Sequence, residues 1–163
     1  VDVRPGPTLA RGRMRVLLFG GPGDEGIVDR ILSLTRTRIA RCLTTDIRLF
    51  AARLSHCRLL VCNNSGPLHV ASALGIPTVS FMGPTVRQRW VPRGERHVVL
   101  RVDDLPCIGC NAGICRVGTH DCMRNIRPER VMEVIREAAG IEMRERHPKR
   151  TGHEDSNLHP LPE

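Results

Sequence analysis

Short apolar runs recur along the chain, and polar turn residues separate them. Each run is about four residues long and largely apolar, which is typical of a buried strand. Such strands are typical of a parallel sheet that is covered by helices on both sides. The expected strands are 16–19, 59–62, 78–81 and 97–100, with a further short strand near residues 39–40.

Between these runs, apolar residues recur with a helical period. Asp24 is a candidate N-cap for the first helix, and further helices are expected over 47–54, over 67–74 and from Pro128 to Gly140. The positions expected to face the core are Ile27, Ile31, Leu32 and Leu34 in the first helix and Val131, Val134, Ile135 and Ala138 in the last. The alternation predicts an α/β fold, a Rossmann-like parallel sheet with helices on both faces.

The chain of 163 residues is long enough for one hydrophobic core and short for two. We expect one ordered domain over 14–140, which includes a cysteine-rich loop at 107–122. Residues 1–13 are rich in Pro, Gly and Arg and are expected to be a linker or disordered, and the polar residues 141–163 a disordered tail. The chain does not begin with Met, which favours a fragment, although a natural short protein is not excluded.

The formal net charge is +8, and almost all of the positive charge is arginine. This reflects either a general arginine bias or attraction to phosphates or an anionic membrane face. Nucleic acid is an unlikely partner because the chain has only three Phe, one Trp and no Tyr to stack on bases. No run of 18 apolar residues predicts a membrane span, and no signal-peptide pattern opens the sequence.

The loop at 63–69 is the clearest candidate site, because a polar loop here joins a buried strand directly to a helix. Asn64 and Ser65 are good N-caps, Gly66 allows close backbone approach, and His69 lies one turn further along the same face. Unpaired N–H groups and the helix dipole favour an anion at such a helix start, so we expect a diphosphate there. An ordinary capped helix with a nearby histidine remains the alternative.

Two further loops follow strands and are expected at the same edge of the sheet, where ligands of such folds bind. In the glycine-rich loop at 20–25, Glu25 could accept hydrogen bonds from ribose hydroxyls or simply stabilise the start of its helix. Gly83, Pro84 and Thr85 form a turn that could approach the ligand or only reverse the chain.

Four of the seven cysteines lie close together, Cys107, Cys110, Cys115 and Cys122, in the spacing C-x2-C-x4-C-x6-C. The first pair has metal-ligand spacing, so zinc or an iron–sulfur cluster is one interpretation. Free thiols, or disulfides formed on air oxidation, are the other. The remaining cysteines, Cys42, Cys57 and Cys62, fall in helix or strand positions and are expected to be small core residues.

Several motifs together resemble glycosyltransferase family 9, the family of the ADP-heptose:lipopolysaccharide heptosyltransferases. The matching segments are NNSGPLHVA at 63–71, FMGPT at 81–85, LFGGPG at 18–23, Arg89-Trp90 followed by Pro92, and Cys122-Met123 followed by IRPERV at 126–131. The resemblance covers about residues 14–139 and corresponds to the C-terminal, donor-binding half of a two-domain GT-B enzyme.

The resemblance implies inverting, metal-independent transfer from a nucleoside-diphosphate sugar such as ADP-heptose to a lipid-linked saccharide of lipopolysaccharide or another cell-envelope acceptor. It also implies a cytoplasmic protein with peripheral contact at the inner membrane. The donor-binding residues that it indicates are Asn64, Ser65, Gly66, His69, Glu25, Gly83, Pro84 and Thr85. The catalytic base is expected in an N-terminal acceptor domain that this sequence lacks, so we expect the 163 residues alone to be inactive.

Two departures from the family pattern affect the interpretation. The first strand of the donor domain, which ends near a phosphate-contacting lysine, has no match, and Asn64 stands where many heptosyltransferases have Asp. The alternatives are a metal-binding or interaction module built on the cysteine loop, a charge-driven nucleic-acid binder, or an inactive remnant of a longer gene.

Overall fold

The computed structural model describes residues 14–140, except for the side chains of Arg87 and Gln88. The expected linker 1–13 and tail 141–163 lie outside the described residues. The strands are β1 (Leu17–Gly20), β2 (Ala40–Leu43), β3 (Leu60–Asn63), β4 (Thr78–Phe81) and β5 (His97–Leu100). The helices are α1 (Glu25–Leu34), α2 (Ile47–Leu54), α3 (Gly66–Ala73), α4 (Arg87–Trp90), α5 (Asp121–Arg124) and α6 (Pro128–Ala138).

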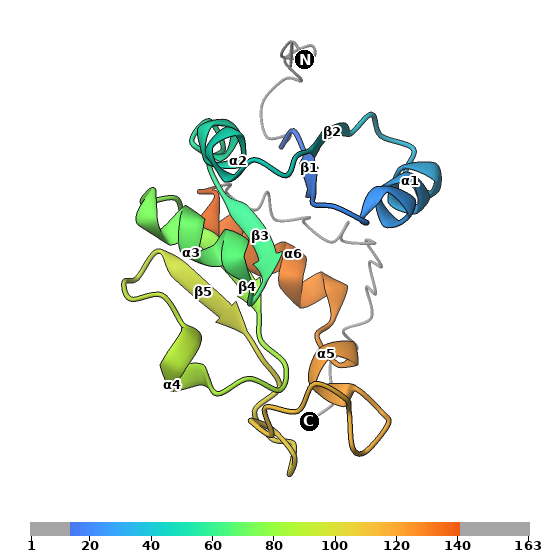
Figure 1. Ribbon diagram of the computed structural model, residues 1–163. Coiled ribbons are helices and arrows are strands. Elements are labelled where there is room, and N and C mark those ends of the chain that lie inside the picture. Colours follow the sequence, from blue (N-terminus) through green and yellow to red (C-terminus); the bar gives the residue numbers. More distant parts are fainter. Residues whose placement is uncertain (1–13, 141–163) are drawn as a thin grey trace, which may run out of the picture.

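The five strands form two parallel sheets (Figure 1), one of β1 and β2 and one in the order β3-β4-β5. The parallel α/β architecture is as expected, but the strands are divided between two sheets because β3 pairs with β4 and not with β1. All three strands of the larger sheet are parallel, so the loops after β3, β4 and β5 emerge at one edge.

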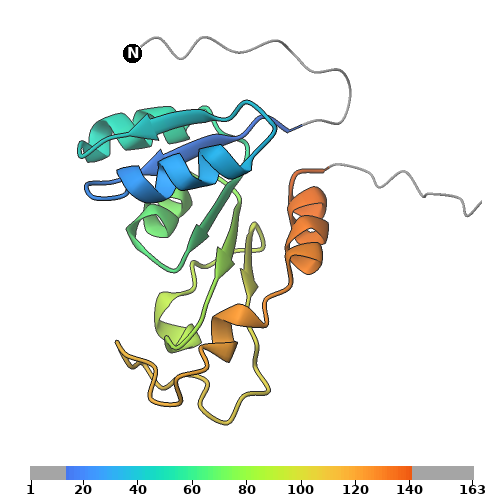
Figure 2. The same cartoon turned by 90° about the vertical axis from the view of Figure 1, so that its right-hand side faces the viewer.

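Helices cover both faces of the larger sheet. Figure 2 shows α3 on one side of β3, β4 and β5 and α6 on the other. In agreement, α3 contacts β3 and β4, whereas α6 contacts β4 and β5. Within the described part of the chain, no helix has both the length and the apolar character needed to cross a bilayer.

The core of the fold joins the two sheets. Leu54, Leu60, Ala71 and Ile76 form a buried cluster, and Phe19 of β1 packs against it. Phe19 also meets Phe50 edge-on, with ring centroids 5.0 Å apart. Full burial of a Leu side chain contributes roughly 1.5–3 kcal/mol. The packing of Phe19 against this cluster joins β1 to the larger sheet.

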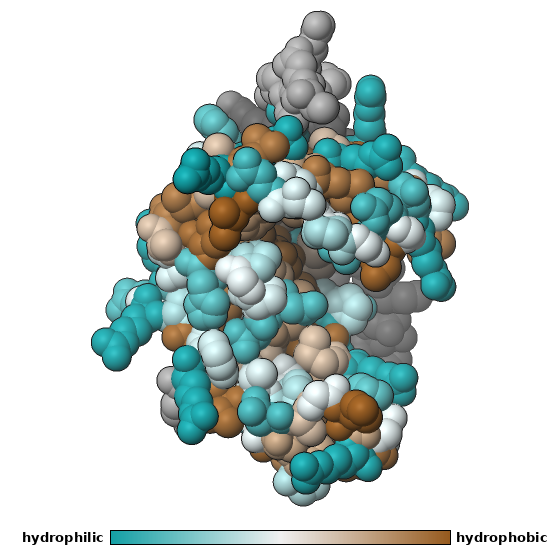
Figure 3. All heavy atoms as spheres, viewed as in Figure 1, coloured by the Kyte–Doolittle hydropathy of each residue, from teal (hydrophilic) through white to brown (hydrophobic). Residues whose placement is uncertain are grey.

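The prediction of which α1 residues face the core is wrong in part. Val28 is the buried residue of this helix, whereas the expected core residues Ile27, Ile31 and Leu34 are 63%, 37% and 77% exposed. The reason is that α1 lies over a sheet of only two strands, which is too narrow to cover its whole apolar face. Apolar surface is visible in the upper part of the molecule, where α1, α2 and β1 lie (Figure 3). The expected inner face of α6 is confirmed, with Val134 buried.

Candidate functional site

The loop after β3 is tied to the loop after β4 through Asn64. Its backbone N–H donates to Phe81 O at 3.1 Å, and its side-chain Nδ2 donates to Thr85 Oγ1 at 2.9 Å. Two residues predicted to bind the donor, Asn64 and Thr85, therefore lie together although they are 21 positions apart. The amide of Asn64 keeps a second N–H and its carbonyl oxygen for other partners.

Helix α3 begins at this junction with an open end. Ser65 is the N-cap, but its hydroxyl donates to Asn63 O at 3.3 Å and caps none of the first-turn N–H groups. Ser65, Gly66 and His69 are exposed, and a Cβ placed on Gly66 would meet no atom within 4 Å. On the inner face of the same helix, Leu68 is fully buried in the core. The exposed helix start is thus suited to an anion, because its backbone donors and dipole face solvent.

Trp90 borders this helix start, and sequence reasoning did not assign it to the site. Its ring centroid lies 6.2 Å from that of His69, with the rings tilted by 54°. Both side chains are exposed, and Trp90 is the only tryptophan of the chain. A lone exposed Trp in a short helix was the available signal. Such a ring offers an apolar face to a base or sugar.

The turn after β4 is held by the cysteine loop. The backbone N–H of Asn111 donates to Pro84 O at 2.8 Å. A Cβ on Gly83 would lie 2.8 Å from Met123 Sδ and 3.4 Å from Cys122 Sγ, so any larger residue would displace Met123. Glycine allows this close packing, and the cysteine loop thus supports the candidate site.

The glycine-rich loop after β1 has its contacts elsewhere. Asp24 occupies the N-cap position of α1 as expected, but its carboxylate accepts from Gly21 N–H at 2.8 Å and does not cap the helix. A Cβ on Gly20 would lie 2.7 Å from Leu43 Cδ2, so glycine lets β1 end close to β2. Glu25 is exposed in the first turn of α1, and none of the contacts above joins it to Asn64 or Thr85.

The four loop cysteines are free thiols that influence one another. Burial raises the pKa of the Cys122 thiol, and the neighbouring Cys107, Cys115 and Cys110 raise it further. The pKa of Cys115 is lowered, chiefly by the backbone N–H of His120. Within residues 14–140, however, the structure contains no group of three His, Cys, Asp or Glu side chains that is arranged to hold a metal ion.

The other three cysteines are small core residues, as predicted. Cys42 is buried, and Cys57 and Cys62 pack against the central cluster. Burial raises the pKa of Cys62 to about 11 and also raises that of Cys57. The thiols of Cys57 and Cys62 therefore stay protonated at neutral pH.

Comparison with known proteins gives a consistent result. The family model for glycosyltransferase family 9 (heptosyltransferase) matches residues 8–120. Lipooligosaccharide heptosyltransferase 2 of Campylobacter jejuni is 29% identical over 126 residues, which are 74% of this chain and 40% of that protein. Lipopolysaccharide heptosyltransferase 2 of Escherichia coli is 30% identical over 129 residues, 74% of this chain and 36% of that one.

Solved structures agree with these relatives. A glycosyl transferase family 9 protein from Veillonella parvula superposes with a TM-score of 0.68 at 25% identity, covering 78% of this chain and 37% of that one. ADP-heptose LPS heptosyltransferase II of E. coli gives 0.62 at 26% identity, covering 77% and 36%. The chain thus spans about two fifths of the length of these relatives or less. The family model, the related sequences and the solved structures agree that this chain belongs to glycosyltransferase family 9, the heptosyltransferase family.

Proposed function

We propose that this domain binds the nucleoside-diphosphate sugar of a heptosyltransferase-like enzyme. The observation that carries the proposal is the exposed, uncapped start of α3 at the carboxyl edge of the larger sheet. Ligands of parallel α/β folds bind at this edge, and a diphosphate is the anion that a sugar donor brings there. Membership of the family supports the same assignment.

In the proposed reaction, an acceptor hydroxyl attacks the anomeric carbon with inversion while the bond from that carbon to the diphosphate oxygen breaks. The negative charge that develops on the leaving diphosphate is stabilised by the α3 amides, the Ser65 hydroxyl and the His69 imidazole. The helix holds the α3 amides in place before reaction, so transfer is proposed to need no metal. The amide of Asn64 holds a sugar hydroxyl, with Thr85 fixing its orientation.

The remaining groups of the site flank the nucleoside in this proposal. The Gly83–Thr85 turn and Trp90 border the helix start, and Glu25 accepts from ribose hydroxyls. The acceptor, a lipid-linked saccharide of the cell envelope, and the base that takes the hydroxyl proton are proposed to lie with a second domain at the cytoplasmic face of the inner membrane. The 163 residues alone are therefore expected to bind donor without transferring the sugar.

Calorimetric titration with adenosine diphosphate tests the donor site. His69→Ala is expected to weaken binding about tenfold, because one charge-assisted or neutral donor to the diphosphate is lost. His56→Ala is the matched control, since His56 is also exposed but lies after α2. Equal affinity in the native chain and His69→Ala, or equal loss in both variants, would exclude the proposed site.

Metal binding by the cysteine loop stays a separate prediction, which rests on the metal-ligand spacing of Cys107 and Cys110. Elemental analysis of protein purified under reducing conditions is the test. Stoichiometric zinc or iron that disappears in Cys107→Ser would support a metal-binding module. A nucleic-acid binder would instead show steeply salt-dependent duplex binding that His69→Ala leaves unchanged.

A further inference from the structure

Trp90 is the one Phe or Trp residue of this chain that the fold leaves open to solvent. The three phenylalanines, Phe19, Phe50 and Phe81, are all partly buried, whereas Trp90 is 47% exposed. It is the last residue of the short helix α4 and lies outside the central cluster of the core. An indole combines a large apolar face with a polar N–H group, which suits it to bind a ligand at a surface.

The face of the indole is not covered by its aromatic neighbour. The ring centroids of Trp90 and His69 lie 6.2 Å apart, and the ring planes are tilted by 54°. This is a tilted contact and not parallel stacking, in agreement with the exposure of both side chains. The indole face is therefore available to a planar group that reaches the start of α3.

Two contacts give the candidate site a direction. The segment that follows β4 meets the start of α3 twice, through the hydrogen bond of Thr85 with Asn64 and through the ring pair of Trp90 with His69. The N-cap of α3 lies between Asn64 and His69 in the chain. One flank of the helix start is thus hydrogen-bonding and the other is aromatic. A nucleoside-diphosphate sugar has a matching order, with sugar hydroxyls at one end, the diphosphate between and a planar base at the other end.

We propose that the nucleobase of the sugar donor stacks on Trp90, with the sugar directed toward Asn64 and Thr85. This inference rests on the donor binding proposed above and adds the orientation of the donor and a residue that selects its base. Stacking on an aromatic side chain accepts every base but strengthens with the size of the π face. Trp90 therefore favours a purine over a pyrimidine nucleotide.

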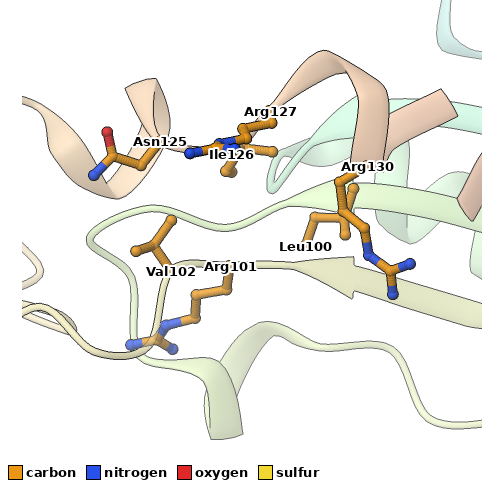
Figure 4. Close-up of a pocket in the computed structure, with 7 residues that line it drawn as sticks. All are labelled: Leu100, Arg101, Val102, Asn125, Ile126, Arg127 and Arg130. Atoms are coloured by element: carbon orange, nitrogen blue, oxygen red, sulfur yellow. The ribbon is translucent and has the colours of Figure 1, made fainter. Parts of the chain in front are cut away.

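The cavity of about 200 Å³ between β5 and α6 does not offer this combination. Figure 4 shows Arg101 pointing away from Arg127, and the Nε of Arg101 lies 3.1 Å from Asp103 Oδ1. Arg127 and Arg130 are exposed, and no aromatic residue is among those that line the cavity. A nucleobase would find no stacking partner there, so the dependence of binding on the base distinguishes the two places.

Because Trp90 is the only tryptophan, the fluorescence of the full chain reports directly on stacking. Fluorescence and calorimetric titrations compare adenosine diphosphate, uridine diphosphate and inorganic pyrophosphate. We expect adenosine diphosphate to quench the emission with the same midpoint as in calorimetry, uridine diphosphate to bind more weakly, and pyrophosphate to bind without comparable quenching. Equal quenching by pyrophosphate, an unchanged emission with bound adenosine diphosphate, or equal affinity for the two nucleotides would overturn the inference.

Variants of Trp90 separate base stacking from a structural role. Trp90→Ala is expected to weaken binding of adenosine diphosphate at least about fivefold, and to leave pyrophosphate affinity and the unfolding midpoint unchanged. Trp90→Phe keeps a π face and is expected to retain most of the affinity. Leu74→Ala is the matched control, because Leu74 is 42% exposed at the other end of α3. An equal loss in Leu74→Ala, or loss of both ligands in Trp90→Ala, would contradict the inference.

The failure of this inference and the failure of the proposed donor site give different results. If the native chain and Trp90→Ala bind adenosine diphosphate and pyrophosphate equally well, the diphosphate site stands and the role given to Trp90 is wrong. If neither ligand binds the native chain, or if His69→Ala leaves pyrophosphate affinity unchanged, the donor site is wrong and the inference fails with it.

Discussion

His97 illustrates how a single residue couples the sheet to its helices. It begins β5, and its Nδ1 lies 3.0 Å from Thr78 Oγ1 while its Nε2 lies 3.4 Å from Ser72 Oγ of α3. Thr78 is fully buried at the start of β4. Desolvation lowers the pKa of His97 below the ordinary 6.5, and the charge of Arg96 lowers it further. The neutral imidazole is therefore the form that the fold prefers.

This preference makes stability depend on pH in a defined direction. Below about pH 6.5 the unfolded chain binds a proton at His97 before the folded chain does, so the free energy of unfolding falls as pH falls. The contribution is complete above the unfolded pKa and is lost as the pH drops through it. Urea unfolding at pH 7.5 and 5.5 measures the effect, and His97→Gln is expected to reduce the difference. An unchanged pH dependence in the variant would contradict this assignment.

At the scale of elements, the start of α3 can be changed without harming the helix. Aspartate is as good an N-cap as serine, and Ser65 already has extended backbone angles, φ −152° and ψ 178°. Because the Ser65 side chain caps nothing, Ser65→Asp is expected to keep or raise stability, by up to about 1 kcal/mol. The added charge would repel a diphosphate.

The predicted signature of Ser65→Asp is therefore opposite in two measurements. Thermal unfolding should show an equal or higher midpoint, while affinity for adenosine diphosphate should fall at least tenfold. Loss of both stability and binding would indicate a structural role for Ser65, and retention of both would place the diphosphate elsewhere.

The contact between the cysteine loop and the turn after β4 is a second element-scale test. Gly83→Ala would bring a methyl group to 2.8 Å from Met123 Sδ, so the flexible Met123 side chain would have to shift, at a cost of about 1 kcal/mol. Met123→Ala removes the clash, so the double variant is expected to regain part of the lost stability. A double-mutant cycle of unfolding free energies measures this coupling. Additive changes in the unfolding free energy would mean that the two side chains do not interact.

Elements that form through interactions between residues close in sequence could be predicted, whereas contacts between distant residues could not. The residues of β4 and β5 are those expected from the apolar pattern, and α6 buries the face that its periodicity indicates. Helix α4 has only four residues, too few for a periodicity, so Trp90 beside His69 was not foreseen. The loops after β3 and β4 meet at one edge of the sheet as expected, through the hydrogen bond from Asn64 to Thr85, whereas the loop after β1 follows a strand of the other sheet.

At the scale of the whole molecule, the sequence pattern did not predict the division into two sheets. Apolar residues predict strands at β1 and β3 but not which strand each one pairs with. The exposed Ile27 and Leu34 of α1 have the same origin, because the width of the sheet beneath decides how much of a helix is covered. The buried Arg101 was also invisible in the sequence, since arginine is mostly a surface residue.

The central claim is that the backbone amides at the start of α3 hold a diphosphate. Two-dimensional amide NMR of the isotope-labelled chain, titrated with adenosine diphosphate and then with adenosine monophosphate, tests it most directly. We predict that the amide signals of Gly66 and His69 shift with the diphosphate and much less with the monophosphate, while that of Gly75 beyond the other end of α3 stays in place. Saturable shifts confined to other residues, with Gly66 and His69 unmoved, would contradict the account.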